Sequence, residues 1–287
     1  MSTERKFRSL DERGLDFEAF PMKLWQKGKQ LGTWDPAEID FTQDRRDWEQ
    51  AETLEQEVLL HLTAQFLGGE ESVTQDLLPL IMAISDEGRL EEEMYLTSFL
   101  FEEAKHVEVF SRFFDEVVGF TGDLTRFHGD HYKKIFHEAL PEAMNQLRND
   151  PSPVNQAQAS ATYNMIVEGV LAETGYHAYF TTLEEHELLP GMQKVARLLK
   201  QDESRHMAFG VHLLSRLVEE HGEPVWERIE STMSELLPHA IGMVEEVFDS
   251  YEEMPMGLEV GEFVEFSMDQ YQKRYERIES SREKHVA

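Results

Sequence analysis

The sequence of 287 residues contains no cysteine. Disulfides, thiolate metal ligands, iron–sulfur clusters and cysteine nucleophiles are therefore excluded. The chain also lacks any apolar run near the roughly 18 residues that a membrane span needs. Its polar start, Met1 to Lys6, has no apolar stretch of the kind found in signal peptides. We therefore expect a soluble, cytoplasmic protein without a membrane span.

Basic residues are scarce relative to acidic ones. The chain has 27 Lys and Arg against 57 Asp and Glu, which gives a net charge of −30. Such a charge repels phosphate backbones and anionic lipid headgroups, so we expect neither nucleic acid nor membrane surfaces as partners. An acidic surface usually serves solubility. The carboxylates become chemically informative only where they are buried.

The chain shows helical periodicity and no convincing strand pattern. Residues 1–42 resemble an irregular arm, because Pro21, Gly28, Gly32 and Pro36 interrupt them. Beyond the arm, apolar residues recur at three- and four-residue steps. Helices are predicted at about 45–67, 70–84, 90–118, 131–147, 154–183, 191–220, 225–251 and 258–278, with a break at Gly68-Gly69 between the first two. The pattern predicts one all-helical domain over 1–287, with long, nearly antiparallel helices.

Two Glu-x-x-His pairs, Glu103 with His106 and Glu203 with His206, are the first chemical signal. At a spacing of three, both side chains of a pair leave the same helix face and could hold one ion together. One such pair is weak evidence, because a chain this rich in glutamate contains roughly two by chance. A solvated helix face is the more common explanation of a single pair.

A repeated arrangement strengthens this signal. Glu70 precedes Glu103 by 33 positions, and Glu168 precedes Glu203 by 35. Apolar residues surround these glutamates, and carboxylates on apolar helix faces are costly unless they are paired or bind a metal. Four carboxylates and two neutral imidazoles balance the charge of two divalent cations. The alternative is a set of buried ion pairs without metal.

The set matches the ligand pattern of ferritin-like di-iron bundles, in which two helices supply one glutamate each and two others supply Glu-x-x-His. Oxygen and imidazole ligands suit iron or manganese, and zinc remains an alternative. We therefore predict a ferritin-like bundle with additional helices around a four-helix dimetal core. The predicted metal ligands are Glu70, Glu103, His106, Glu168, Glu203 and His206.

With these motifs, the sequence resembles the small subunit of ribonucleotide reductase, and within that superfamily most closely the ligand-binding oxidases. The arm carries Trp34-Asp-Pro-Ala-Glu-Ile-Asp, similar to a stretch that precedes the first core helix of the reductases. The resemblance implies a hydrogen-bonded path from Trp34 through Asp202 to His106. An aspartate in this place would also orient the imidazole toward the metal.

Phe110 stands where radical-storing reductase subunits carry tyrosine, four residues after the first motif histidine. A phenyl ring has no hydroxyl to oxidise, so no tyrosyl radical can form there. The chain also lacks a long acidic tail with a radical-relay tyrosine. Some reductase subunits nevertheless carry phenylalanine and use a manganese–iron pair. A radical-generating reductase subunit therefore remains an alternative, as does a non-catalytic metal- or lipid-binding bundle.

Two further stretches resemble the oxidases, Gly68 to Thr74 and Ala161 to Glu168. In that family they bear a valine–tyrosine ether link, and the matching pair is Val73 and Tyr163. The resemblance implies a manganese–iron centre, with di-iron as the alternative, and a bound long-chain fatty acid. It also implies dioxygen as oxidant, a two-electron oxidation of an apolar substrate, and a homodimer. The substrate and the electron donor are not implied.

The ether link requires an irregular helix. Tyr163 and Glu168 are five positions apart, which places them roughly 140° from each other in an ideal α-helix. Both face the centre only where the helix is locally wider, as in a π-bulge, and such bulges concentrate at functional sites. We therefore predict a π-bulge between Tyr163 and Glu168.

Overall fold

The computed structural model describes residues 7–10, 12, 14–119 and 122–286. Residues 1–6, whose polar character suggested the absence of a signal peptide, lie outside the described part. The α-helices are α1 Phe20–Leu31, α2 Thr42–Gln50, α3 Thr53–Asp76, α4 Leu78–Asp86, α5 Leu90–Phe113, α6 Asp130–Tyr132, α7 Leu140–Gln146, α8 Pro153–Ser160, α9 Glu173–Tyr179, α10 Pro190–His221, α11 Glu223–Asp249 and α12 Val260–Val286. The π-helical segments are η3 Phe114–Val118, η5 Lys133–Ala139, η6 Ala161–Ala172 and η7 Phe180–Glu184. Four short 3-10 helices complete the set, η1 Arg8–Leu10, η2 Pro36–Glu38, η4 Leu124–Phe127 and η8 Pro255–Gly257.

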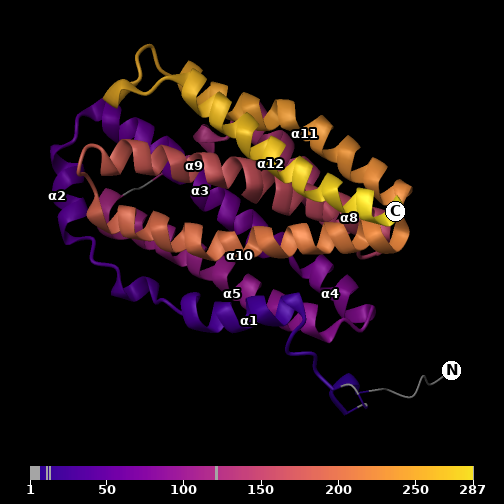
Figure 1. Ribbon diagram of the computed structural model, residues 1–287. Coiled ribbons are helices and arrows are strands. Elements are labelled where there is room, and N and C mark those ends of the chain that lie inside the picture. The colour runs from indigo at the N-terminus through magenta and orange to yellow at the C-terminus, as the bar shows by residue number, and fades with distance from the viewer. Residues whose placement is uncertain (1–6, 11, 13, 120–121, 287) are drawn as a thin grey trace.

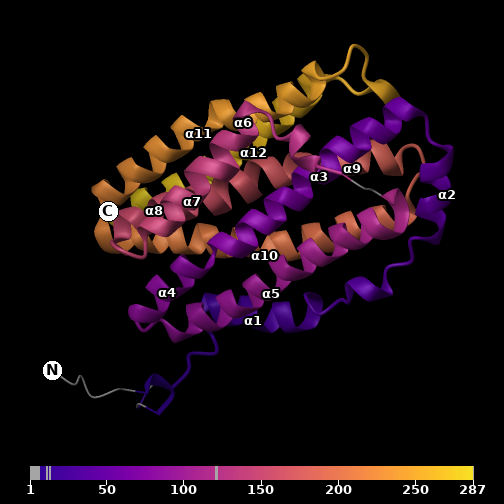
Figure 2. The ribbon, with the colours of Figure 1, turned by 180° about the vertical axis from the view of Figure 1, so that it is seen from behind.

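The described residues contain helices and no strand, which confirms the predicted all-helical fold. The long helices run side by side, with α10 next to α5 and the continuous α8–η6–α9 rod (Figures 1 and 2). Helix α3 packs on α5, while α11 and α12 cover the rod on the side away from α1. The four rods α3, α5, α8–η6–α9 and α10 thus form the core on which the site is built.

The predicted irregular arm is wrong over Phe20–Leu31, which forms helix α1. Proline at its start fits a first-turn position, and Gly32 follows its last residue. Met22 and Leu24 on one face are buried, and α1 packs against α5 and α10. Tertiary packing of this apolar face therefore stabilises a helix in a segment whose Pro and Gly residues had led to the prediction of an irregular arm.

The predicted break at Gly68-Gly69 is also wrong, because α3 runs unbroken from Thr53 to Asp76. A Cβ atom at Gly68 would lie 2.6 Å from the hydroxyl of Tyr132, and one at Gly69 would contact Phe136. Gly68 therefore allows Tyr132 to approach α3 closely. Helix α3 continues through both glycines and ends before Leu77.

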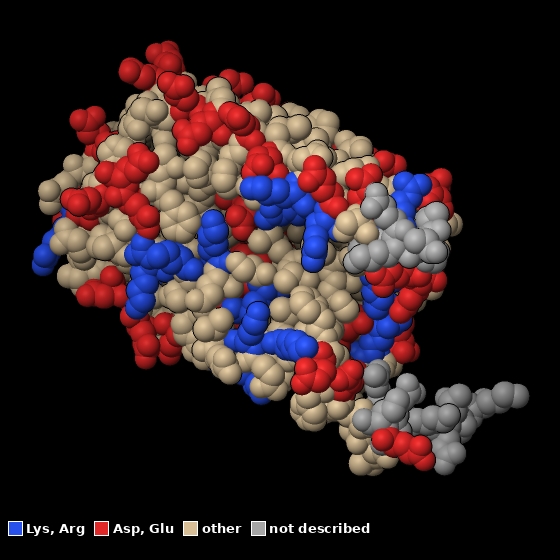
Figure 3. Space-filling model, in the orientation of Figure 1, with Lys and Arg blue, Asp and Glu red and all other residues tan. Residues whose placement is uncertain are grey.

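The surface carries the charge that the composition predicts. On the face of Figure 3, acidic side chains gather at the upper left, over the connection between α11 and α12, and Lys and Arg lie across the middle. None of the described helices is both long enough and apolar enough to cross a membrane. The buried carboxylates lie elsewhere, inside the four-rod core.

Candidate metal centre

The six predicted ligands meet in the middle of the bundle. Four rods contribute them: α3 supplies Glu70, α5 supplies Glu103 and His106, η6 supplies Glu168, and α10 supplies Glu203 and His206. The side chains are buried, with exposed fractions between 0% and 6%. Six polar groups thus converge on one water-poor place, as the repeated spacing predicted.

The six side chains form two overlapping groups. We call Glu70, Glu103, His106 and Glu203 the His106 group, and Glu103, Glu168, Glu203 and His206 the His206 group. In each group one ligand atom per residue lies within 4.8 Å of all the others. Glu103 and Glu203 belong to both groups. They therefore have the position that carboxylates bridging two ions would need.

Both imidazoles present the same nitrogen to the centre. His106 Nδ1 lies 3.3 Å from Glu70 and 3.5 Å from Glu103, and His206 Nδ1 lies 3.1 Å from Glu103 and 3.4 Å from Glu168. The Nε2 atoms point outward. Each Nδ1 is thus placed to bind an ion, while Nε2 is left to an outer partner.

The outer partner of His106 is Asp202, as the resemblance predicted. His106 Nε2 lies 3.3 Å from Asp202 Oδ2, and Trp34 Nε1 donates to the same oxygen at 2.8 Å. The indole and imidazole rings are nearly parallel, with centroids 6.4 Å apart. Asp202 is 0% exposed. Hydrogen bonds of this kind hold a ligand imidazole in one orientation.

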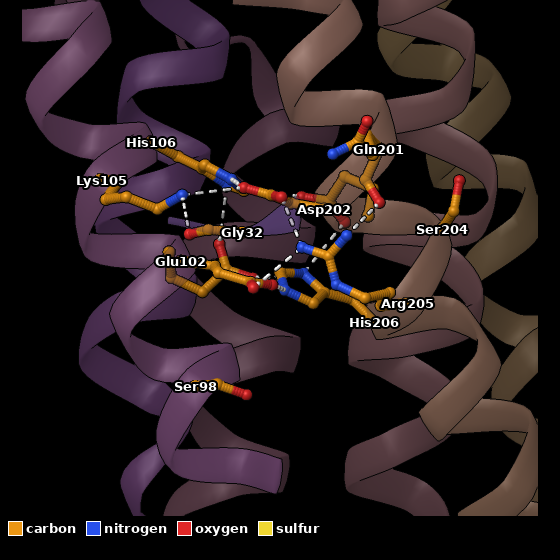
Figure 4. Close-up of polar contacts among 12 residues, drawn as sticks. Gly32, Ser98, Glu102, Lys105, His106, Gln201, Asp202, Ser204, Arg205 and His206 are labelled. Carbon is orange, nitrogen blue, oxygen red and sulfur yellow. Dashed lines mark hydrogen bonds and ion pairs between the residues drawn. The ribbon is translucent and has the colours of Figure 1, made fainter. Parts of the chain in front are cut away.

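The equivalent partner of His206 is Glu102, which the sequence prediction missed. Its Oε2 lies 2.9 Å from His206 Nε2 (Figure 4). A signal was available, since an acidic residue directly precedes each motif glutamate: Glu102 before Glu103, and Asp202 before Glu203. Each of these acids reaches the histidine of the opposite helix. The two halves of the centre are therefore alike: the acid on α5 contacts the histidine on α10, and the acid on α10 contacts the histidine on α5.

The titration of these groups follows from their burial. Burial raises the pKa of Glu70 to about 7, and burial together with the nearby Glu168 carboxylate raises the pKa of Glu203 well above its usual range. Burial also opposes ionisation of Glu103, but the two imidazoles beside it outweigh this and lower its pKa. Without added positive charge, the cluster therefore retains protons that divalent cations would displace.

Several polar atoms of the centre have no hydrogen-bond partner. Glu103 Oε2, Glu168 Oε1, Glu203 Oε2 and His206 Nδ1 are buried and accept or donate no hydrogen bond. Buried polar atoms are rarely left unpaired, and each such case requires an explanation. Oxygen and imidazole donors of this type suit manganese and iron. The residues therefore fit a dimetal centre.

The predicted π-bulge is present, since η6 is π-helical from Ala161 to Ala172. The wider turn brings Tyr163 and Glu168 toward the same centre: Tyr163 donates to Glu103 at 2.9 Å, and the amide of Asn164 donates to Glu168 at 2.8 Å. Val73 lies buried on α3, one turn after Glu70. Val73 and Tyr163 belong to the same cluster of buried side chains.

An apolar cavity lies against the centre. It contains about 1080 Å³ of empty space, its mouth included. All four metal-centre carboxylates, Glu70, Glu103, Glu168 and Glu203, line it together with Val73. Most of its remaining wall is apolar, and its lining includes Phe66, Leu171, Met243, Phe248, Met254, Leu258 and Phe263. The apolar lining therefore suits an apolar molecule beside the six ligands.

Comparison with known proteins gives a consistent result. Residues 21–275 match the family model of the ribonucleotide reductase small chain. A solved R2-like ligand-binding oxidase, a glycine-to-phenylalanine variant with an aerobically reconstituted Mn/Fe cofactor, is 39% identical with a TM-score of 0.88, and the match covers 92% of this chain and 98% of that one. A valine-to-isoleucine variant of an R2-like ligand-binding oxidase is 38% identical with a TM-score of 0.91, covering 96% of this chain and 99% of that one. The chain belongs to the ribonucleotide reductase small-chain family and, within it, to the R2-like ligand-binding oxidases.

Proposed function

We propose that this protein is a dioxygen-dependent dimetal oxidase whose cofactor is one manganese and one iron ion. The ligands would be Glu70 and His106 for one ion, Glu168 and His206 for the other, and Glu103 and Glu203 for both. One observation carries the proposal: Glu103, Glu168 and Glu203 each bury a carboxylate oxygen that has no hydrogen bond, and the same three carboxylates line an apolar cavity. Solved relatives that carry a Mn/Fe cofactor support the choice of metals.

Bound at this centre, the two metals would supply the activation of dioxygen that no side chain here provides. The chain's own residues define the conditions for that chemistry. Asp202 and Glu102 orient the two imidazoles. The apolar wall of the cavity limits water at the centre, which strengthens the electrostatic interactions there.

We further propose that Val73 and Tyr163 become joined by an ether bond. The bond would form between Val73 Cβ and Tyr163 Oη, breaking one C–H and one O–H bond, with two electrons and two protons passing to dioxygen. Glu103 is placed to accept the phenolic proton, because Tyr163 already donates to it at 2.9 Å. In solved relatives, the substituted valine and tyrosine are as far apart in sequence as Val73 and Tyr163 are here.

The ligand that we propose for the cavity is a long-chain fatty acid or a similar apolar molecule. The cavity lies beside the metal-centre carboxylates, and its lining contains no Lys or Arg. An acyl chain would be favoured by the apolar wall. Within the cavity, a carboxylate headgroup would find compensating positive charge only at metal ions bound by the metal-centre carboxylates.

The direct test is anaerobic loading with Mn²⁺ and Fe²⁺, followed by exposure to dioxygen. We expect two bound transition-metal ions per chain, consumption of dioxygen, and loss of two hydrogens in the intact mass. A chain that binds no transition metal would refute the proposal. Two bound ions without consumption of dioxygen would instead favour the non-catalytic metal- or lipid-binding bundle.

A radical-generating reductase subunit is the second candidate, and the small-chain family match favours it. Phe110 weighs against tyrosyl-radical storage because its phenyl ring has no hydroxyl. The ring is buried and stacks on Phe66 at a centroid distance of 5.4 Å. Restoration of nucleotide reduction by a large reductase subunit would support this candidate. The cytoplasmic location and the homodimer stay predictions.

A further inference from the structure

One guanidinium links the outer partners of both histidines. Arg205 Nη2 donates to Glu102 Oε1 at 2.8 Å and to Asp202 Oδ1 at 2.5 Å (Figure 4). Glu102 contacts His206, and Asp202 contacts His106, through their other oxygens. A continuous chain of hydrogen bonds therefore runs from one candidate ligand imidazole to the other and passes through a single side chain.

The chemistry of this position suits arginine. Arg205 is only 4% exposed, and its Nη1 also donates to the backbone carbonyl of Gln201 at 2.9 Å, which orients the guanidinium plane. A planar guanidinium presents several donors in fixed directions, whereas a lysine ammonium is a flexible point charge. Arg205 and Lys105 together balance the charges of Glu102 and Asp202. The buried cluster is thus neutral and geometrically defined.

The two outer carboxylates depend on Arg205 to different degrees. Asp202 also accepts from Trp34 Nε1 at 2.8 Å and from Lys105 Nζ at 3.1 Å. For Glu102, Arg205 is the one cationic side chain of Lys or Arg type in contact among the described residues. Loss of the guanidinium would therefore leave Asp202 with Trp34 and Lys105 besides His106, and Glu102 with no partner besides His206.

We propose that Arg205 is a positioning residue that couples the two histidine ligands and governs mainly the ion of the His206 group. The inference rests on the proposed dimetal function and deepens it. Arg205 acts through Glu102, which holds His206 in the orientation that directs Nδ1 to the centre. Mutation of a residue that orients a metal ligand typically weakens metal binding by about 10–100-fold.

The test is anaerobic titration of the metal-free full chain with Mn²⁺ alone, read by low-temperature EPR and calorimetry. The wild type should bind two ions that give a magnetically coupled signal. Arg205→Gln should lower the affinity for one of the two ions by about 10–100-fold. One equivalent of Mn²⁺ should then give the signal of an isolated ion. Arg216→Gln is the matched control, because Arg216 lies on the same helix and pairs with Glu92, away from the centre. It should behave as the wild type.

Two further variants guard against misfolding and locate the effect. Glu102→Gln should reproduce the loss at one ion with Arg205 in place, and Arg205→Gln added to Glu102→Gln should cost little more, since coupled residues are not additive. Arg205→Lys should fail to restore the coupled signal. Equal affinities for both ions in Arg205→Gln, or an equal loss in Arg216→Gln, would overturn the inference. Failure of the wild type to bind Mn²⁺ would instead overturn the proposed function.

Discussion

The hydroxyl of Tyr163 donates a hydrogen bond to Glu103 Oε1 over 2.9 Å, and both side chains are 0% exposed. Glu103 belongs to both ligand groups, so this bond ties the phenol to the middle of the candidate centre. The π-helical turn of η6 allows it while Glu168 faces the same centre. Burial beside these carboxylates raises the pKa of Tyr163 well above its ordinary value. The phenol of Tyr163 is therefore protonated in the resting protein.

Replacing Tyr163 should abolish the proposed ether link. After aerobic loading with Mn²⁺ and Fe²⁺, the intact mass of the wild type should fall by two hydrogens, and that of Tyr163→Phe should not change. Tyr176→Phe is the control, since Tyr176 is also fully buried near the centre but its hydroxyl has no hydrogen-bond partner. The same mass loss in Tyr163→Phe as in the wild type would exclude this tyrosine from the link.

Removal of metal should destabilise the fold. Ions that bind only the folded chain stabilise it by about 4 kcal/mol when their free concentration is a thousand times the dissociation constant. Chelation should therefore lower the melting temperature of the wild type. Glu103→Gln removes a carboxylate from both ligand groups, so its melting temperature should respond much less to metal. Identical melting curves with and without metal in the wild type would contradict this expectation.

Filling the cavity should displace its ligand without disturbing the metals. Leu171 is half-buried and lines the cavity. Leu171→Trp should reduce the amount of long-chain fatty acid that co-purifies or binds, measured by extraction and mass spectrometry, while two ions remain. Leu198→Trp serves as control because Leu198 is half-buried outside the cavity lining. Unchanged ligand content in Leu171→Trp would show that the acyl chain lies elsewhere.

His61 should make stability depend on pH. Burial lowers the pKa of this imidazole from 6.5 to about 4, and its nitrogens contact Tyr251 and Gln65 at 3.1 and 3.2 Å. The unfolded chain takes up this proton below pH 6.5 and the folded chain only near pH 4. His61 therefore lowers the free energy of unfolding as the pH falls through this window, by about 3 kcal/mol in total.

The measurement is urea unfolding at pH 7 and pH 5. His61→Gln should be less stable than the wild type at pH 7, because it loses the stacking of the ring on Phe127, yet it should lose less stability between the two pH values. His221→Gln, at an exposed position, should keep the wild-type difference. A pH response of His61→Gln equal to that of the wild type would refute the assignment.

Local sequence was sufficient for the all-helical character of the chain and for the six side chains that meet at the centre. The Glu-x-x-His spacing places two ligands on one helix face, and the repeat of the unit predicted which glutamates join them. Once the family resemblance placed Tyr163 at the centre, its five-residue separation from Glu168 predicted the π-helical turn, since an α-helix cannot direct both to one point. These are properties of helix geometry, which depends on spacing alone.

Tertiary structure decided what spacing cannot express. Gly68 and Gly69 looked like a break, but they lie inside a continuous helix, where the hydroxyl of Tyr132 leaves no room for a Cβ atom at Gly68. The pairing of Glu102 with His206 joins residues 104 positions apart, and the bridge through Arg205 exists only where α5 and α10 meet. Helix periodicity determines which face of its own helix a residue occupies. Only the packing of the helices decides which neighbouring helix lies against that face, and hence which buried charges neutralise one another.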